Sequence, residues 1–128
     1  MVNVVLDTVI SHIKPGVTPL KLDQIAEELI REGGDLPTFK GHKVPGVKPY
    51  PATLCVSPND IVVHGIPTGE PLKEGDVVVL DIGLTHKGLV VDMAKTIPVG
   101  ETDEEARKLI RVTEEALYKG IGAVRHGA

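Results

Sequence analysis

Apolar residues recur every three or four positions in three segments of the chain, which is the spacing of one face of an α-helix. The first segment predicts a helix over residues 2–14. The second predicts a helix over residues 19–32, with Thr18 as N-cap and Pro19 at the first helical position. The third predicts a helix over residues 103–125 that opens with acidic residues.

The middle of the chain carries short runs of β-branched residues bounded by turn-forming residues, a pattern typical of strands. It predicts four strands, over residues 53–57, 61–66, 76–84 and 89–99. Residues 35–51 contain four prolines and predict a long loop. Two helices, four strands and a last helix predict an α+β fold, in which helices cover an antiparallel sheet.

Composition narrows the class of protein. The 128 residues have the length of one domain, and the net charge of −4 disfavours a protein that binds nucleic acid. No apolar run is long enough to cross a membrane. Cys55 is the single cysteine, which excludes a disulfide framework within the chain and favours a reducing cytoplasm as its location.

Two aspartates come together in the predicted hairpin of the last two strands. With His86 and Lys87 as a two-residue loop, Asp81 lies opposite Asp92, and a bulge at Gly88 would keep them close. Both lie in aliphatic sequence, where two like charges are unfavourable unless they are protonated or neutralised. A divalent cation would neutralise them, so the pair is a candidate metal site. The alternative is that one aspartate points to solvent or caps a turn.

Two further residues could take part in chemistry. His64 ends a β-branched run and is followed by Gly65, which indicates a turn there. At such a turn the imidazole could donate a hydrogen bond to a substrate carbonyl or carry a proton. The alternative is a histidine that is satisfied in the core or at a sheet edge. Cys55 has no acid or base at a fixed spacing that would indicate a nucleophile. We therefore expect it to be a small buried apolar residue.

Several motifs resemble those of type I methionine aminopeptidases. Residues 55–67 read CVSPNDIVVHGIP and resemble the signature of that family. Residues 72–76 (LKEGD) and 80–83 (LDIG) resemble it as well, and residues 88–96 (GLVVDMAKT) resemble the strand that carries its second metal ligand. The resemblance extends over essentially the whole chain.

This resemblance implies the pita-bread fold, in which two similar α+β halves surround a pseudo-two-fold axis, and this chain corresponds to the N-terminal half over residues 1–128. It also implies the removal of methionine from the N-termini of peptides or proteins by an enzyme with divalent cobalt, manganese, iron or zinc. By resemblance, Asp81 and Asp92 match two metal ligands. His64 matches the histidine that contacts the substrate and stabilises the transition state.

Other features concern the methionine pocket and the missing half. Phe39, Tyr50 and Cys55 fall at or near positions that line the pocket in the family, although the loop 43–49 is longer than usual there. The family's three other metal ligands, a histidine and two glutamates, belong to the second half, as does a general base. The helix ends at 13–17 and 124–128 share a pattern, which is expected if the chain spans one repeat unit.

These observations predict a homodimer of halves, because a sheet with apolar residues on both faces needs a second covering layer. A two-fold pair would bring Asp81 and Asp92 of each copy towards one centre and give an aminopeptidase of weak or altered activity. Two other functions stay open: a non-catalytic peptide-binding or assembly module, and an inactive fragment of a full-length enzyme. The presence of both aspartates together with His64 favours the enzyme over the module.

Overall fold

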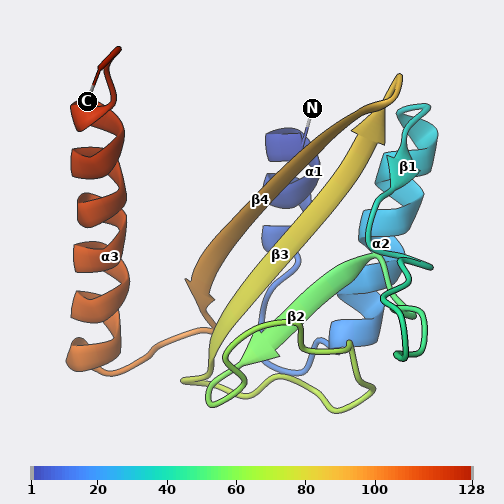
Figure 1. Cartoon of the computed structure of the whole chain (residues 1–128). Coiled ribbons are helices and arrows are strands. Elements are labelled where there is room, and N and C mark those ends of the chain that lie inside the picture. Colours follow the sequence, from blue (N-terminus) through green and yellow to red (C-terminus); the bar gives the residue numbers. More distant parts are fainter. Residues whose placement is uncertain (1, 128) are drawn as a thin grey trace.

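The computed structural model describes residues 2–127 and has the α+β class that the sequence predicts (Figure 1). Three helices and four strands follow one another in chain order. They are α1 (Val2–Ile10), α2 (Pro19–Glu32), β1 (Leu36–Pro37), β2 (Leu54–Pro58), β3 (Val77–His86), β4 (Leu89–Pro98) and α3 (Glu104–Ala123).

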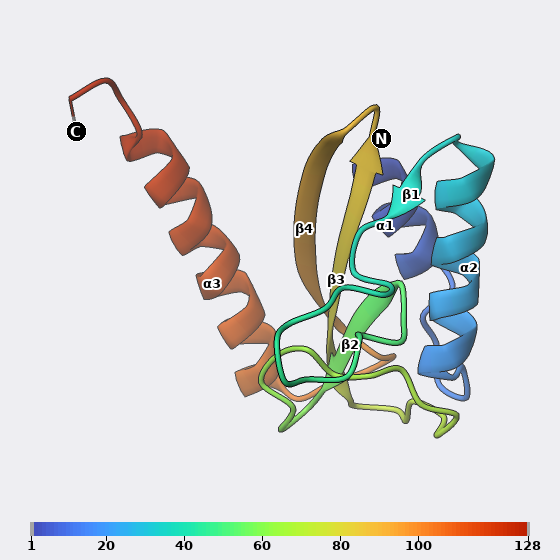
Figure 2. The same ribbon diagram turned by 45° about the vertical axis from the view of Figure 1, so that its right-hand side comes forward.

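Strand β3 is the centre of an antiparallel sheet. Strand β4 pairs with it along its whole length on one edge, while β2 and the short β1 share the other edge. Helix α1 contacts β3 and β4, and α2 contacts β1 and β2, so both helices cover the same face (Figures 1 and 2). The opposite face of the sheet is left open, and α3 stands apart from it beyond β4 (Figure 2).

The core lies between the sheet and the first two helices. Alternate side chains of β3 point into it, as the two-residue period of a strand requires. Helices α1 and α2 contribute their predicted apolar stripes. The fully buried side chains include Leu6, Val9, Leu22, Ile30, Leu54, Val56, Val78, Leu80, Ile82 and Leu84.

The helix bounds agree with the sequence for α2 and differ at the other two helices. The side chain of Thr18 accepts a hydrogen bond from the backbone of Lys21, so it caps α2 as predicted. Helix α1 ends at Ile10 rather than near residue 14, because the chain tightens there into i→i+3 bonds, such as that from His12 N to Val9 O at 3.0 Å. Helix α3 begins after its N-cap Asp103 and ends at Ala123, two residues earlier than predicted.

The predicted strand over residues 61–66 is wrong, because this segment is an irregular loop. The outer edge of β2 beside it is free, but an isolated backbone bond from Val56 N to Gly65 O does not make a strand ladder, and Val62 is 84% exposed. His64 has φ +59°, which interrupts extended backbone. The strand missing from the sequence prediction is β1, which lies inside the stretch predicted as a long loop.

The predicted hairpin register is also wrong, by one turn position. The two-residue loop is Lys87–Gly88, and both residues have positive φ, as a type I′ turn requires. Asp81 therefore lies opposite Ala94 rather than opposite Asp92. Because the shift is an even number of residues, the two aspartates stay on the same face of the sheet.

Helix α3 buries none of its residues in this chain. Its apolar stripe is open to solvent and includes Leu109, Val112, Leu117 and Ile121. Within residues 2–127, no helix combines the length and the apolar character needed to cross a bilayer. The stripe is thus an exposed surface made of aliphatic residues that are typical of a protein core.

A matched pair of leucine substitutions tests this division between core and stripe. We expect Leu80→Ala, at a fully buried position of strand β3, to lower the free energy of unfolding by about 2–5 kcal/mol. We expect Leu109→Ala, at a position that is 68% exposed, to lower it by less than about 0.5 kcal/mol. Urea unfolding of both variants at low protein concentration measures the difference, and equal losses would contradict it.

Candidate active site

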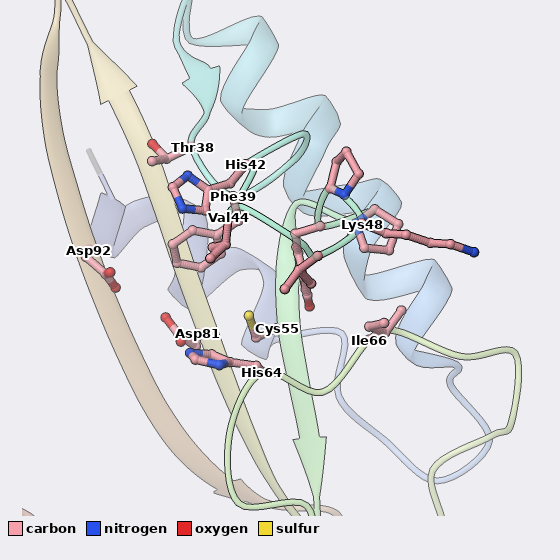
Figure 3. A pocket seen from close by; sticks show the side chains of 14 residues that line it. Thr38, Phe39, His42, Val44, Lys48, Cys55, His64, Ile66, Asp81 and Asp92 are labelled. Atoms are coloured by element: carbon pink, nitrogen blue, oxygen red, sulfur yellow. The ribbon is translucent and has the colours of Figure 1, made fainter.

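A cavity of about 820 Å³ lies on the open face of the sheet (Figure 3). All six residues singled out in the sequence line it, namely Phe39, Tyr50, Cys55, His64, Asp81 and Asp92. Sequence reasoning missed the other residues of its wall, which are Thr38, His42, Val44, Val47, Lys48, Pro49, Pro51 and Ile66. Most of these lie in the proline-rich stretch, whose length was the one available signal of a functional loop.

The floor of the cavity is set by strand register. Cys55 of β2 lies directly opposite Asp81 of β3, so both side chains point to the open face. On the other edge of β3, Asp92 lies opposite Gly83, two residues along from Asp81. The three side chains thus cross the sheet on one face, each from a different strand (Figure 3).

The two carboxylates influence each other electrostatically. Partial burial raises the pKa of Asp81 above its usual value, and the nearby Asp92 raises it further. The imidazole of His64 lies beside Asp81 and opposes this rise (Figure 3). Two carboxylates that share an apolar floor favour either a bound proton or a bound cation between them.

His64 is presented at the rim by an unusual local backbone. Its backbone is in the left-handed region, which is unfavourable for residues with a Cβ. Such a conformation persists only where surrounding contacts hold it. Gly65 supplies two of those contacts, because its carbonyl accepts from Val56 N at 2.9 Å and its N–H donates to Ser57 Oγ at 3.1 Å. A Cβ on Gly65 would lie 2.2 Å from Val56 O, so only glycine fits so close to β2.

Phe39 forms a wall of the cavity because β3 has a glycine beneath it. A Cβ on Gly83 would lie 2.6 Å from the phenyl ring of Phe39, so the ring rests directly on the strand backbone. The neighbouring Thr38 N donates to Gly83 O at 3.0 Å and holds this segment against the sheet edge. The open face therefore has room for an aromatic ring where a larger residue would displace it.

Residues 41–50 form a hairpin-like flap over the cavity, although the sequence predicted only a loop. Its base is closed by hydrogen bonds from Gly41 N to Tyr50 O at 2.8 Å and from Tyr50 N to His42 O at 3.0 Å. Its tip is a turn closed by Val47 N to Val44 O at 3.0 Å. Both valines are exposed and line the cavity, so the flap presents apolar side chains at its mouth.

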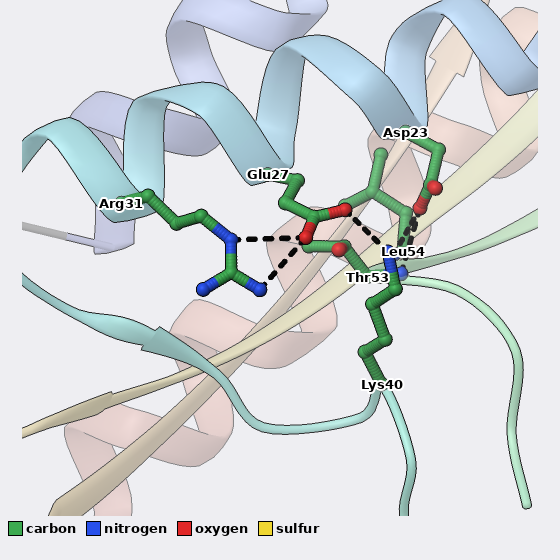
Figure 4. A network of polar contacts seen from close by, with 6 residues as sticks. All are labelled: Asp23, Glu27, Arg31, Lys40, Thr53 and Leu54. Atoms are coloured by element: carbon green, nitrogen blue, oxygen red, sulfur yellow. Dashed lines mark hydrogen bonds and ion pairs between the residues drawn. The ribbon is translucent and has the colours of Figure 1, made fainter.

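A polar network fastens the wall of the cavity to α2 (Figure 4). The buried carboxylate of Asp23 accepts from Thr53 N at 2.8 Å and Leu54 N at 2.7 Å, at the start of β2. Glu27 accepts from Lys40, the residue after Phe39, at 2.6 Å. Burial raises the pKa of Asp23. The pKa of Glu27 is lowered, because Glu27 accepts hydrogen bonds from Lys40 and Arg31.

The oxygen donors at the floor suit a hard or borderline divalent cation. Asp81 and Asp92 offer up to four carboxylate oxygens on a partly desolvated surface, which is the chemistry that such a cation requires. No three His, Cys, Asp or Glu side chains come together in a metal-binding group anywhere in residues 2–127. The donor set fits a divalent cation but is incomplete in this chain.

Comparison with protein families identifies the family of this chain. The model of metallopeptidase family M24 matches residues 1–128. The chain belongs to this family. Methionine aminopeptidase 1 of Bacillus subtilis is 44% identical over 116 residues, which are 91% of this M24 chain and 45% of that relative. The methionine aminopeptidase of Clostridium perfringens is 47% identical over 109 residues, which are 85% of this chain and 42% of that relative.

Solved structures of M24 proteins share the fold. The methionine aminopeptidase of Thermotoga maritima superposes with a TM-score of 0.88 at 39% identity, over 95% of this chain and 47% of that one. The methionine aminopeptidase of Rickettsia prowazekii has a TM-score of 0.84 at 33% identity, over 91% and 45% of the two chains. These findings confirm the resemblance and the half pita-bread fold, and the chain spans less than half the length of these relatives.

The raised pKa of Asp81 predicts how stability depends on pH. A carboxyl group whose pKa is higher in the folded state binds its proton more tightly there, so stability is lost as the pH rises from the ordinary value of 3.8 through the folded-state pKa. We expect Asp81→Asn to raise the melting temperature at pH 7 in chelator and to change it little at pH 3. Thermal unfolding followed by circular dichroism measures this.

The exposed Asp60→Asn is the control for this experiment, because it removes the same charge from a loop outside the cavity. We expect its melting temperature to change little at either pH. An Asp81→Asn gain as large at pH 3 as at pH 7 would contradict the electrostatic account.

Proposed function

We propose that this M24 chain forms one half of a metal-dependent aminopeptidase-type hydrolase that removes residues from peptide or protein N-termini. One observation carries the proposal: two carboxylates and an imidazole, from three separate segments, meet in one cavity on the open sheet face. The methionine aminopeptidases that match most of this chain support the same reaction class.

Asp81 and Asp92 would hold the cation, which by analogy with the family is cobalt, manganese, iron or zinc. When bound, the cation supplies Lewis-acid polarisation of the scissile carbonyl. Desolvation by the surrounding sheet strengthens the interaction of both carboxylates with a positive charge. Their side chains are fixed by β3 and β4, which are paired residue by residue, so the oxygens are held on a rigid support.

His64 would donate a hydrogen bond to the substrate carbonyl oxygen as negative charge develops there. It lies at the rim beside Asp81, where such an oxygen would enter. Phe39, Tyr50 and Cys55 would form the wall against the N-terminal side chain of the substrate. The exposed valines of the flap leave that wall open to solvent, so we propose no strict preference for methionine.

We further propose that a second copy supplies the missing half in a two-fold homodimer. The open sheet face and the α3 stripe expose apolar surface that a monomer does not cover. A two-fold arrangement would place four aspartates around one centre and so complete the set of metal ligands. Because this ligand set differs from that of the family, we propose that the activity is weak or altered. The free thiol of Cys55 suits a reducing compartment, and we propose the cytoplasm.

A non-catalytic peptide-binding module is the second candidate. The incomplete donor set of residues 2–127 favours it, because a cavity with apolar walls can bind a peptide without a metal. An inactive fragment of a longer enzyme predicts the same lack of turnover but no self-association. Oligomeric state and turnover together separate the three possibilities.

The homodimer is tested by light scattering coupled to size-exclusion chromatography. We expect twice the chain mass at micromolar concentration, and we expect Leu117→Glu, on the exposed stripe of α3, to shift the population towards monomer because it places a charge in an apolar interface. Glu114→Gln, a mild change on the same helix, is the control. A well-folded monomer at all concentrations would exclude the homodimer.

Activity is tested with purified protein, cobalt or manganese, and short peptides. We expect slow release of the N-terminal residue, and we expect His64→Ala to lower turnover roughly 10²-fold while metal uptake stays unchanged, because the imidazole acts on the substrate. The double variant Asp81→Asn with Asp92→Asn should lose both metal uptake and turnover. Turnover no higher than that of the free metal would overturn the catalytic proposal in favour of the binding module or fragment.

A further inference from the structure

Tyr50 makes contacts that lining a substrate pocket does not require. We propose that the Tyr50 hydroxyl is a positioning group for His64, because it fastens the loop over residues 59–67 to the start of β2. This inference deepens the proposed function, since it rests on His64 acting on the substrate. The positioning itself is a property of the chain and can be measured without turnover.

The hydroxyl bridges two backbone carbonyls that belong to different segments. Tyr50 Oη lies 2.9 Å from Leu54 O, in β2, and 3.0 Å from Gly65 O, in the loop. A phenol has one proton, so the two carbonyls share it as acceptors. Gly65 directly follows His64, so this bridge fixes the backbone one residue after the imidazole.

Around His64 the loop has few other contacts that hold its shape. Its apolar side chains Ile61, Val62 and Val63 are exposed and give it little packing. Its first residues are anchored separately, by Asn59 to Asp76 and Val77 and by Ile61 N to Pro58 O at 3.1 Å. Next to His64, besides the Tyr50 bridge, Gly65 makes two hydrogen bonds with β2. Polar contacts at Gly65 therefore hold the left-handed backbone of His64, a conformation that is unfavourable for any residue with a Cβ.

The protonation of Tyr50 suits this role. Burial raises the pKa of its phenol, and the neighbouring Cys55 thiol raises it further, so the group keeps its proton at neutral pH. A protonated phenol can donate to a carbonyl, whereas a phenolate cannot. The same residue closes the base of the flap through both of its backbone polar groups, so Tyr50 connects the flap to the His64 loop.

Tyr50→Phe removes this hydroxyl and keeps the ring. Tyr118→Phe is the matched control, because Tyr118 is the other tyrosine of the chain and is 64% exposed on α3. The first readout is the carbon-bound imidazole proton signal of His64 in the full chain at fixed pH without metal, assigned with His64→Gln. We expect a displaced and broadened His64 signal in Tyr50→Phe and an unchanged signal in Tyr118→Phe.

The second readout is amide hydrogen exchange at Val56 and Gly65. We expect it to accelerate about 5- to 10-fold in Tyr50→Phe, which corresponds to the loss of one neutral hydrogen bond. Ser57→Ala removes the other side-chain anchor of Gly65 and should displace the His64 signal as well. The spectra report the folded fraction, so unfolding of one variant leaves the other to decide.

The third readout is kinetic. With cobalt or manganese we expect Tyr50→Phe to lower kcat about tenfold and to change KM less than twofold, because the wall of the pocket is intact while the imidazole is displaced. Loss confined to KM would instead assign the hydroxyl to substrate binding and would overturn the positioning role.

The outcomes separate the two proposals. If the wild-type chain has no turnover but Tyr50→Phe displaces the His64 signal, the proposed function fails and the positioning of His64 by Tyr50 stands. If the wild type is active and neither Tyr50→Phe nor Ser57→Ala changes the His64 signal, the positioning role is overturned and the proposed function stands.

Discussion

Strand β3 must present two different faces at once, and the rest of the structure depends on this. Its even-numbered residues, such as Leu80 and Ile82, are completely buried against α1 and α2. Its odd-numbered residues, such as Asp81 and Gly83, therefore point to the opposite face. Any shift of β3 by one residue would bury the carboxylate and expose the core, so hydrophobic burial holds the site residues in place.

Two glycines extend this constraint from the sheet to the site. Gly83 leaves space for the ring of Phe39 above β3, and Gly65 lets the His64 loop approach the backbone of β2. In each case the close contact is between backbone or ring atoms that a Cβ would separate. The shape of the cavity therefore depends on the missing side chains of these two glycines as well as on the residues that line it.

The open face explains why the half-fold combines a formed cavity with an unfinished surface. Asp81 and Asp92 share a floor that raises the pKa of Asp81, and a charge of opposite sign would relieve that repulsion. The apolar stripe of α3 lies outside the core of this chain. Both features lie in a chain that spans less than half the length of the M24 relatives from Bacillus subtilis and Thermotoga maritima.

Sequence by itself determined the helices, the core and six of the residues that line the cavity, because apolar periodicity and local motifs depend on neighbours along the chain. Only the tertiary structure decided the rest. Residues 61–66 have strand-like composition, but the positive φ of His64 interrupts their extended backbone. The hairpin register followed the positive φ of Lys87 and Gly88. The flap and the bridge from Tyr50 to Gly65 join distant segments, and contacts of that kind are set by packing in three dimensions, which local sequence does not encode.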